Sequence, residues 1–137
     1  MLISRKTDYA VRCVMFLAGR PGELSSTSQI AAYIDVTDVF VAKILQTLAR
    51  CGVIESVRGT HGGYRLAHAP GGITLLDVVE AIQGPVQLNE CVVEGRGCAL
   101  DQSCPVHSIW VDVRRDLEAQ LRSKTFDQLA APGRSPT

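Results

Sequence analysis

Residues 27–66 read TSQIAAYIDVTDVFVAKILQTLARCGVIESVRGTHGGYRL, and this stretch decides the fold class. Its first part predicts two helices, one ending at Ile34 and a longer one beginning near Asp38. Their inward positions recur at steps of three and four: Ile30, Ala31, Ile34, Val41, Ile44, Leu45 and Leu48. Their candidate N-caps are Thr27, Ser28, Thr37 and Asp38. Two helices joined by about three residues, the second with a partly polar first turn, indicate a helix-turn-helix.

The second part of the stretch predicts a β-hairpin. Val53, Ile54 and Val57 favour a strand, the segment 59–63 has turn chemistry, and 64–66 resumes a strand. A hairpin directly after the second helix of a helix-turn-helix is a wing. We therefore expect a mainly α fold with a winged helix-turn-helix over residues 1–70.

Helices are also predicted on both sides of this unit. Residues 4–19 have helical apolar spacing and no cleavage site after them, so they indicate an amphipathic helix that ends at Arg20-Pro21-Gly22. After Pro70-Gly71-Gly72, Thr74 can cap a helix that finishes at Gly84-Pro85. We expect residues 71–104 to form this connecting helix and a loop that bears three cysteines and binds a ligand.

A long C-terminal helix is predicted from Pro105, a residue favourable in a helix's first turn. Its apolar positions form a narrow stripe with charged flanks: Val106, Ile109, Trp110, Val113, Leu117 and Leu121. Such a stripe needs a partner helix, and a second copy of the chain is the obvious source. We therefore expect a dimerisation helix and a short terminal helix capped by Thr125 over 105–130, and a disordered tail over 131–137.

Charge and composition set the broad class. Residues 1–70 hold eight Lys/Arg and five Asp/Glu, a net charge of +3, and residues 71–137 hold six and nine, a net charge of −3. A basic first half suits a nucleic-acid reader. The apolar stretches are too short for a membrane span, and the chain carries no export signal, so we expect a soluble cytoplasmic protein with reduced thiols. Catalytic motifs are absent from the sequence, and we expect no enzyme activity.

The sharpest motif is Cys91-x6-Cys98-x5-Cys104-x2-His107. Three thiols and an imidazole this close together indicate a metal site, and soft thiolate ligands favour zinc or an iron–sulfur centre. The gaps are wider than those of most structural zinc sites and suit a cluster, although spacing alone leaves both open. Cys13 and Cys51 are expected to be ordinary buried thiols, and His61 and His68 to be exposed.

Two segments are candidates for DNA contact. The first turns of the second helix and the wing can meet base edges, phosphates or the minor groove. The candidate residues are Thr37, Asp38, Val39, Phe40, Lys43, Arg58, Gly59 and His61.

Three segments together resemble a known family: SRKTDYAVR at 4–12, SVRGTHGGYRLA at 56–67, and the cysteine segment that ends in CPVHSIW at 104–110. They are similar to the iron–sulfur winged-helix regulators of the IscR, NsrR and RirA type, over residues 1 to about 130. The resemblance implies a homodimer with crossing C-terminal helices. It also implies an iron–sulfur cluster held by Cys91, Cys98 and Cys104.

The resemblance leaves the fourth ligand open. His107 matches the histidine of IscR-like members, which carry a 2Fe–2S cluster. Asp8 matches the aspartate of NsrR-like members, which carry a 4Fe–4S cluster with an oxygen ligand donated across the dimer. We favour 4Fe–4S with Asp8.

The function expected from these features is a DNA-binding transcriptional regulator that senses nitric oxide, redox state or iron through the cluster. A homodimer predicts a palindromic operator. Two alternatives stay open. One is a zinc-bound or apo regulator of the same fold that responds to a metabolite or a partner protein, and the other is an electron-transfer protein without DNA affinity.

Overall fold

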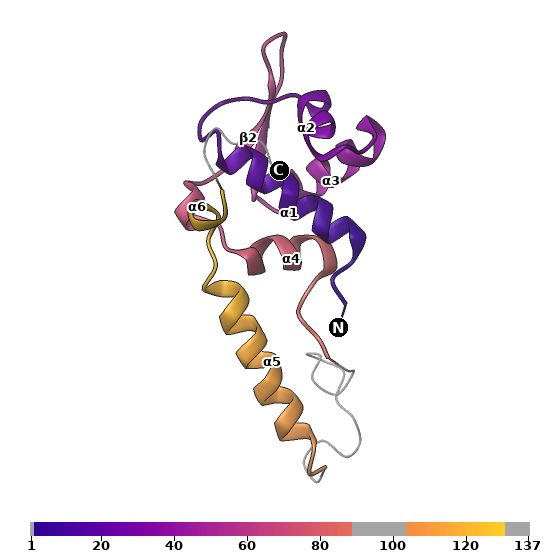
Figure 1. Ribbon diagram of the computed structural model, residues 1–137, viewed down its shortest axis with the longest axis vertical. Coiled ribbons are helices and arrows are strands. Elements are labelled where there is room, and N and C mark those ends of the chain that lie inside the picture. The colour runs from indigo at the N-terminus through magenta and orange to yellow at the C-terminus, as the bar shows by residue number, and fades with distance from the viewer. Residues whose placement is uncertain (1, 89–103, 131–137) are drawn as a thin grey trace.

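The computed structural model describes residues 2–88 and 104–130 of the chain (Figure 1). The elements in order are α1 (Arg5–Ala18), α2 (Thr27–Ile34), α3 (Asp38–Arg50), β1 (Ile54–Val57), β2 (Gly63–Leu66), the 3-10 turn η1 (Pro70–Gly72), α4 (Leu75–Gln83), α5 (His107–Arg122) and α6 (Phe126–Leu129). A helical body with a projecting hairpin lies at one end of the molecule, and α5 extends away from it as an arm (Figure 1).

The predicted winged helix-turn-helix is confirmed. α2 and α3 pack together across a short turn in which Asp35 adopts the left-handed conformation, with φ of 58°. β1 and β2 pair antiparallel with Ile54 opposite Leu66 and Val57 opposite Gly63. The paired Ile54 and Leu66, one from each strand, are buried against the body, while the turn between the strands points outward (Figure 1).

Helix caps explain where α2 and α3 begin. α2 is capped by Ser26 rather than by Thr27 or Ser28, because Gln29 completes a capping box with Ser26: the Ser26 hydroxyl accepts from the Gln29 N–H at 3.1 Å, and the Gln29 side chain accepts from the Ser26 N–H at 2.8 Å. Thr37 caps α3 as predicted, accepting from the Phe40 N–H at 3.3 Å.

α1 forms the centre of the core. It contacts α2, α3, α4, α6 and β2, and its inward side chains Cys13, Val14 and Leu17 are fully buried. The surrounding elements contribute fully buried aliphatic side chains to the same cluster: Ile30, Val41, Ile44, Leu45, Leu48 and Val78. One continuous apolar core therefore holds α2, α3 and α4 around α1.

The C-terminal segment returns to this core after α5. The Phe126 ring is fully buried, its N–H donates to the Ile73 carbonyl at 3.0 Å, and the Leu75 N–H donates to the Lys124 carbonyl at 2.8 Å. Thr125 precedes α6, but its side chain makes no capping hydrogen bond to the backbone; its hydroxyl donates to the Asp127 carboxylate instead. α6 thus fixes the far end of α5 to the start of α4.

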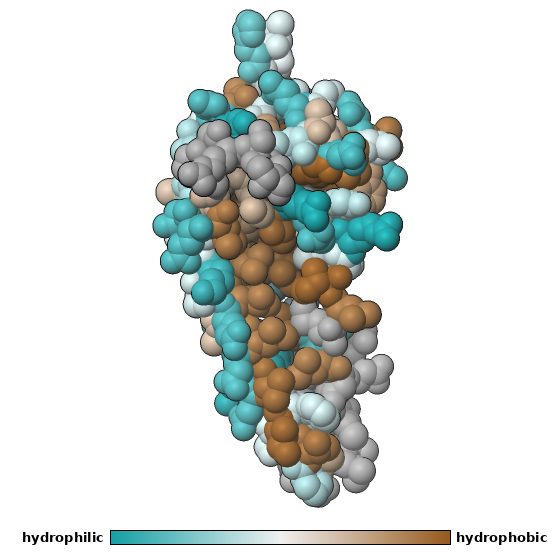
Figure 2. Space-filling view, in the orientation of Figure 1, coloured by the Kyte–Doolittle hydropathy of each residue, from teal (hydrophilic) through white to brown (hydrophobic). Residues whose placement is uncertain are grey.

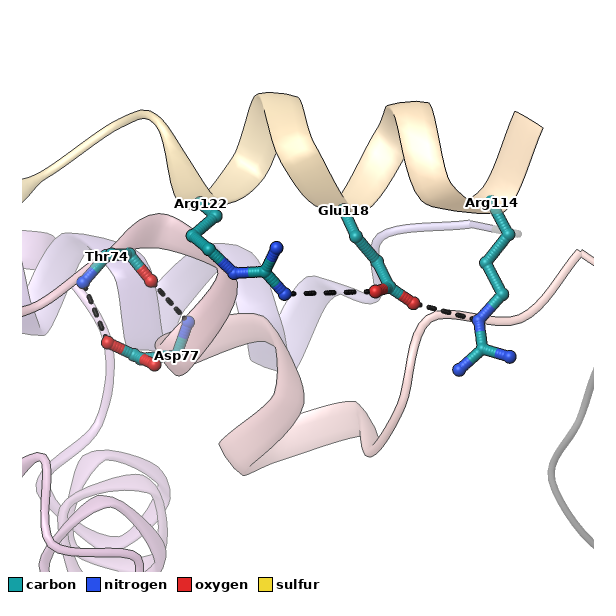
Figure 3. Close-up of polar contacts among 5 residues, drawn as sticks. All are labelled: Thr74, Asp77, Arg114, Glu118 and Arg122. Atoms are coloured by element: carbon teal, nitrogen blue, oxygen red, sulfur yellow. Dashed lines mark hydrogen bonds and ion pairs between the residues drawn. The ribbon is translucent and has the colours of Figure 1, made fainter. Parts of the chain in front are cut away.

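α5 begins at His107, and the prediction that Pro105 lies in its first turn is wrong. The His107 N–H donates to the Cys104 carbonyl at 3.2 Å, so residues 104–107 form a turn before the helix. Two further contacts support the helix: Glu118 lies 2.8 Å from Arg114 and 3.9 Å from Arg122, both at i,i+4 spacing (Figure 3). Figure 3 also shows the capping box of Thr74 and Asp77 that starts α4, which confirms Thr74 as its cap.

The apolar stripe of α5 is largely uncovered. No side chain of α5 is buried, Ile109 and Val113 are 54% and 42% exposed, and the adjoining Val106 is 38% exposed. A continuous brown band runs from the helical body down α5 in Figure 2. None of the helices in residues 2–88 and 104–130 is long and apolar enough to span a bilayer.

Replacing Phe126 by Ala tests the role of α6. Removing a fully buried ring costs about 3–5 kcal/mol in the free energy of unfolding. The exposed neighbour Gln128, replaced by Ala, should change it by no more than about 0.5 kcal/mol. Urea unfolding at one fixed protein concentration measures both, and equal effects would show that α6 is not docked.

Candidate nucleic-acid interface and metal site

The first turns of α3 lie on the surface. Thr37, Asp38, Val39 and Lys43 are exposed, and Val39 is 70% exposed despite its apolar side chain. Exposure of an apolar valine side chain to water is unfavourable, and its methyl groups suit contact with a thymine methyl group. Four of the five predicted α3 residues are therefore accessible to a duplex.

Two contacts fix this turn from within the chain. The Ser28 hydroxyl donates to the Asp38 carboxylate at 2.6 Å and joins the first turn of α2 to that of α3. The partly buried Phe40 ring packs edge-on against Tyr9 of α1, with 5.6 Å between ring centroids and an interplanar angle of 85°. Phe40 thus orients α3, which we call the reading helix, against α1.

One exposed residue of this face was missed by the sequence reasoning. Gln46 lies one turn after Lys43 at i+3 spacing and is exposed. Glutamine can contact adenine through two hydrogen bonds in the major groove. The spacing from Lys43 was the signal that could have identified it.

The wing presents Arg58, Gly59 and His61 at its exposed tip, where the hairpin projects from the body (Figure 1). Glycine is required here for two reasons. Gly59 has φ of 122°, and a Cβ on Gly62 would lie 2.0 Å from the Val57 carbonyl oxygen. Gly59 and Gly62 therefore allow the tight turn that places Arg58 and His61 at the tip.

The base of the wing is tied to the segment before α2. Ser25 and Tyr64 exchange two backbone hydrogen bonds of 2.9 and 2.8 Å, and Gly63 allows this close approach because a Cβ there would lie 2.6 Å from the Ser25 carbonyl oxygen. Glu55 and Arg65 pair across the strands at 2.5 Å. Wing and helix-turn-helix thus form one unit.

Two of the predicted metal ligands lie together at the start of α5. The partly buried Cys104 and His107 share one turn, joined by the backbone hydrogen bond described above. A thiol and an imidazole are ligand types that suit zinc and iron–sulfur centres. Cys91 and Cys98 lie outside the described residues. Within residues 2–88 and 104–130, no three His, Cys, Asp or Glu side chains are placed to hold a metal ion.

Asp8 lies on α1, in the helical body, and α5 begins at the opposite end of the molecule (Figure 1). Its exposed carboxylate contacts Arg12 through Oδ2 at 3.2 Å. Asp8 also borders a groove of about 530 Å³ between α1 and α2, lined by Val11, Arg12, Met15, Tyr33, Ile34 and Asp35. In the described residues, neither Asp8 nor Cys104 belongs to a group of three side chains that could hold a metal ion, and ligation by Asp8 stays a prediction.

The remaining two cysteines differ in environment. Cys13 is buried as predicted, and burial raises the pKa of its thiol from 9.0 to about 12, against a smaller lowering by a backbone hydrogen bond. Cys51 is exposed, which corrects the expectation of a buried thiol. It ends α3 beside an open cleft of about 370 Å³ shared with α4, and its sulfur lies 3.7 Å from the Ala81 carbonyl oxygen.

Alkylation distinguishes these two thiols. In the native protein at pH 8, iodoacetamide should modify Cys51 and leave Cys13 unmodified, because the raised pKa of Cys13 leaves almost no thiolate and its sulfur is inaccessible. In denaturant both should react alike, as peptide mass spectrometry can show. Similar native rates would contradict the burial of Cys13.

Comparison with known proteins agrees with this architecture. The family model Rrf2, described as an iron-dependent transcriptional regulator, matches residues 3–132. The protein aau3 of Rhizobium meliloti is 37% identical over 133 residues, which cover 94% of this chain and 84% of that protein. The transcriptional regulator NsrR of Bacillus subtilis is 33% identical over 106 residues, covering 76% of this chain and 73% of NsrR.

Among solved structures, CymR of B. subtilis, described as its global cysteine regulator, superposes with a TM-score of 0.76 at 27% identity, covering 95% of this chain and 96% of CymR. The family match spans nearly the whole chain, including α3, the wing and the turn at Cys104. The chain belongs to the Rrf2 family of DNA-binding transcriptional regulators.

Proposed function

We propose that this regulator is a cytoplasmic homodimer that binds a palindromic operator and senses nitric oxide, redox state or iron supply through an iron–sulfur cluster. The observation that carries the proposal is the pairing, in one chain, of an exposed reading helix with a thiol–imidazole turn at the start of α5. The description of the family as iron-dependent supports the same reading.

For DNA contact, α3 would enter the major groove and the wing would lie along the adjacent minor groove. Lys43 and Arg58 are exposed cations suited to phosphate or minor-groove contact. Thr37, Val39 and Gln46 offer polar and methyl groups to base edges. The Ser28–Asp38 hydrogen bond holds the carboxylate of Asp38 at one edge of this surface.

For the dimer, the uncovered stripe of α5 would pack against the same stripe of a second copy. A helix with no buried side chain and a row of exposed aliphatic groups gains free energy only when a partner covers the row. A symmetric pair presents two reading helices, and this symmetry is the reason for a palindromic operator.

For sensing, Cys91, Cys98 and Cys104 would supply thiolates, with Asp8 of the second copy as the fourth ligand in a 4Fe–4S cluster, or His107 in a 2Fe–2S cluster. Such a cluster supplies a centre that reacts with nitric oxide and oxygen and is lost when iron is scarce. In this chain the exposed Asp8 carboxylate contacts Arg12 through Oδ2 at 3.2 Å. Ligation across the dimer would join α1 of one copy to the first turn of α5 in the other. Loss of the cluster would remove this link and change the spacing of the two α3 helices in the dimer.

A regulator that works without a cluster is the second candidate. The structural similarity to CymR, described as a global cysteine regulator, favours it. Such a protein would hold zinc at the cysteine site or respond there to a metabolite or a partner protein.

DNA contact is tested by replacing Lys43 and Arg58 with Ala, one at a time. Each loss of a phosphate contact should weaken operator binding and reduce the slope of log K against log salt by about 1. Fluorescence anisotropy over a salt series measures both quantities. Lys124→Ala, which removes an exposed lysine next to α6, is the matched control and should bind as wild type. If Lys43→Ala has the same affinity and salt slope as Lys124→Ala, Lys43 does not contact the DNA.

The cluster is tested by anaerobic purification with absorption and Mössbauer spectra. Wild type should be brown, Cys104→Ala colourless but still a folded dimer, and Cys51→Ala fully coloured as the matched control, because Cys51 lies at the far end of α3. If Asp8 is the fourth ligand, Asp8→Ala alters the spectra and His107→Ala does not; the reverse identifies His107. A colourless wild type without iron and sulfide would exclude the cluster and favour the second candidate.

A further inference from the structure

The side-chain amide of Gln83 bridges two segments that are distant in the sequence. Its Oε1 accepts from the Ser4 N–H at 2.9 Å, and its Nε2 donates to the Leu2 carbonyl at 3.0 Å. Gln83 is the last residue of α4, whereas Leu2 and Ser4 precede α1. One amide thus satisfies a donor and an acceptor of the same backbone segment, as a neighbouring strand would.

The residue held in this way starts α1. The Ser4 hydroxyl accepts from the Thr7 N–H at 3.1 Å and lies 2.9 Å from the Thr7 hydroxyl, which is fully buried. The Ser4 carbonyl accepts from the Asp8 N–H at 3.0 Å. Displacing Ser4 therefore disturbs the first turn of α1, and Asp8 with it.

The same turn is in contact with the reading helix. Tyr9 follows Asp8 directly, and its ring packs on Phe40 in the first turn of α3. The Phe40 N–H donates to the capping Thr37, which is exposed on the DNA-facing turn. A short series of contacts thus leads from Gln83 through Ser4 and Tyr9 to the cap of α3.

On its other side, Gln83 adjoins the segment that leads toward the cysteines. Gly84 ends α4 with φ of 82°, its N–H donating to the Glu80 carbonyl at 2.9 Å, and Val86 is buried two residues later. Gln83 is therefore the last helical residue before the chain leaves α4 in the direction of Cys91.

We infer that Gln83 is a positioning residue that couples the end of α4 to the reading helix by holding the first turn of α1. With respect to sensing, this inference rests on the proposed function. The contacts themselves are made within the chain and can be tested on protein purified without metal. Coupling between sites is commonly about 5-fold or more in affinity, which is large enough to measure.

The test compares Gln83→Met, which keeps the length and loses both hydrogen bonds, with Gln83→Glu, which keeps only the acceptor for the Ser4 N–H. Gln87→Met is the matched control, an exposed glutamine outside α4. Hydrogen exchange of the metal-free protein reports on the amides of Thr7, Asp8, Phe40 and Val41. In Gln83→Met all four should exchange about 5-fold faster. Gln83→Glu should be intermediate and the control unchanged.

Operator affinity is measured on the same proteins, metal-free and as purified anaerobically. The ratio of the two affinities should move toward 1 in Gln83→Met, with partial recovery in Gln83→Glu. Unchanged exchange at Thr7 and Asp8 would show that Gln83 does not hold α1. Faster exchange there with no change at Phe40, Val41 or the operator would confine its role to α1 and overturn the inference. Failure of the cluster proposal looks different, since wild type is then colourless and the exchange results stand by themselves.

Discussion

Burial of α1 is the constraint on which the rest of the structure depends. Its inward face, with Cys13, Val14 and Leu17 fully buried, is the surface against which the reading helices, α4 and the returning C-terminal segment all pack. The elements proposed to bind DNA and those proposed to respond to a signal therefore pack on one central helix. A shift of α1 would displace the helices packed on it, because close-packed interiors transmit displacement rather than absorb it.

The two ends of the molecule differ in how completely one chain covers their apolar side chains and caps their helices. The winged helix-turn-helix is complete within one chain: α2 and α3 are capped, the wing is hydrogen-bonded to Ser25, and the core is continuous. The arm formed by α5 has no buried side chain and a row of aliphatic groups in water. Fold stability thus lies in the body, while α5 is left with a surface suited to association.

Much of the body could be predicted from the sequence because local signals and burial agree there. The steps of three and four in α3, the Thr37 cap and the glycine-rich wing turn all specify the structure that forms. The cap of α2 could not be chosen, because Ser26, Thr27 and Ser28 have the same capping chemistry and only the placement of Gln29 selects Ser26. The prediction that Cys51 is buried was wrong, because helical spacing does not reveal the open cleft between α3 and α4.

The candidate site was less predictable, for a physical reason. Contacts such as Phe40 with Tyr9, or Gln83 with Ser4, join segments far apart in the chain, and no periodicity encodes them. Cys104 and His107 lie on one turn, joined by a backbone hydrogen bond, and both stay predicted ligands. Cys91 and Cys98 remain predicted ligands.

The bridge between Ser25 and Tyr64 has a consequence for the choice of duplex. Because it locks the hairpin to the entry of α2, the separation between the wing tip and α3 is set by the fold before any nucleic acid arrives. A fixed separation matches one combination of groove width and depth. The wide major groove of B-form DNA admits a helix, whereas the deep, narrow major groove of A-form RNA does not. In the proposed complex, this fixed separation would favour B-form DNA over A-form RNA.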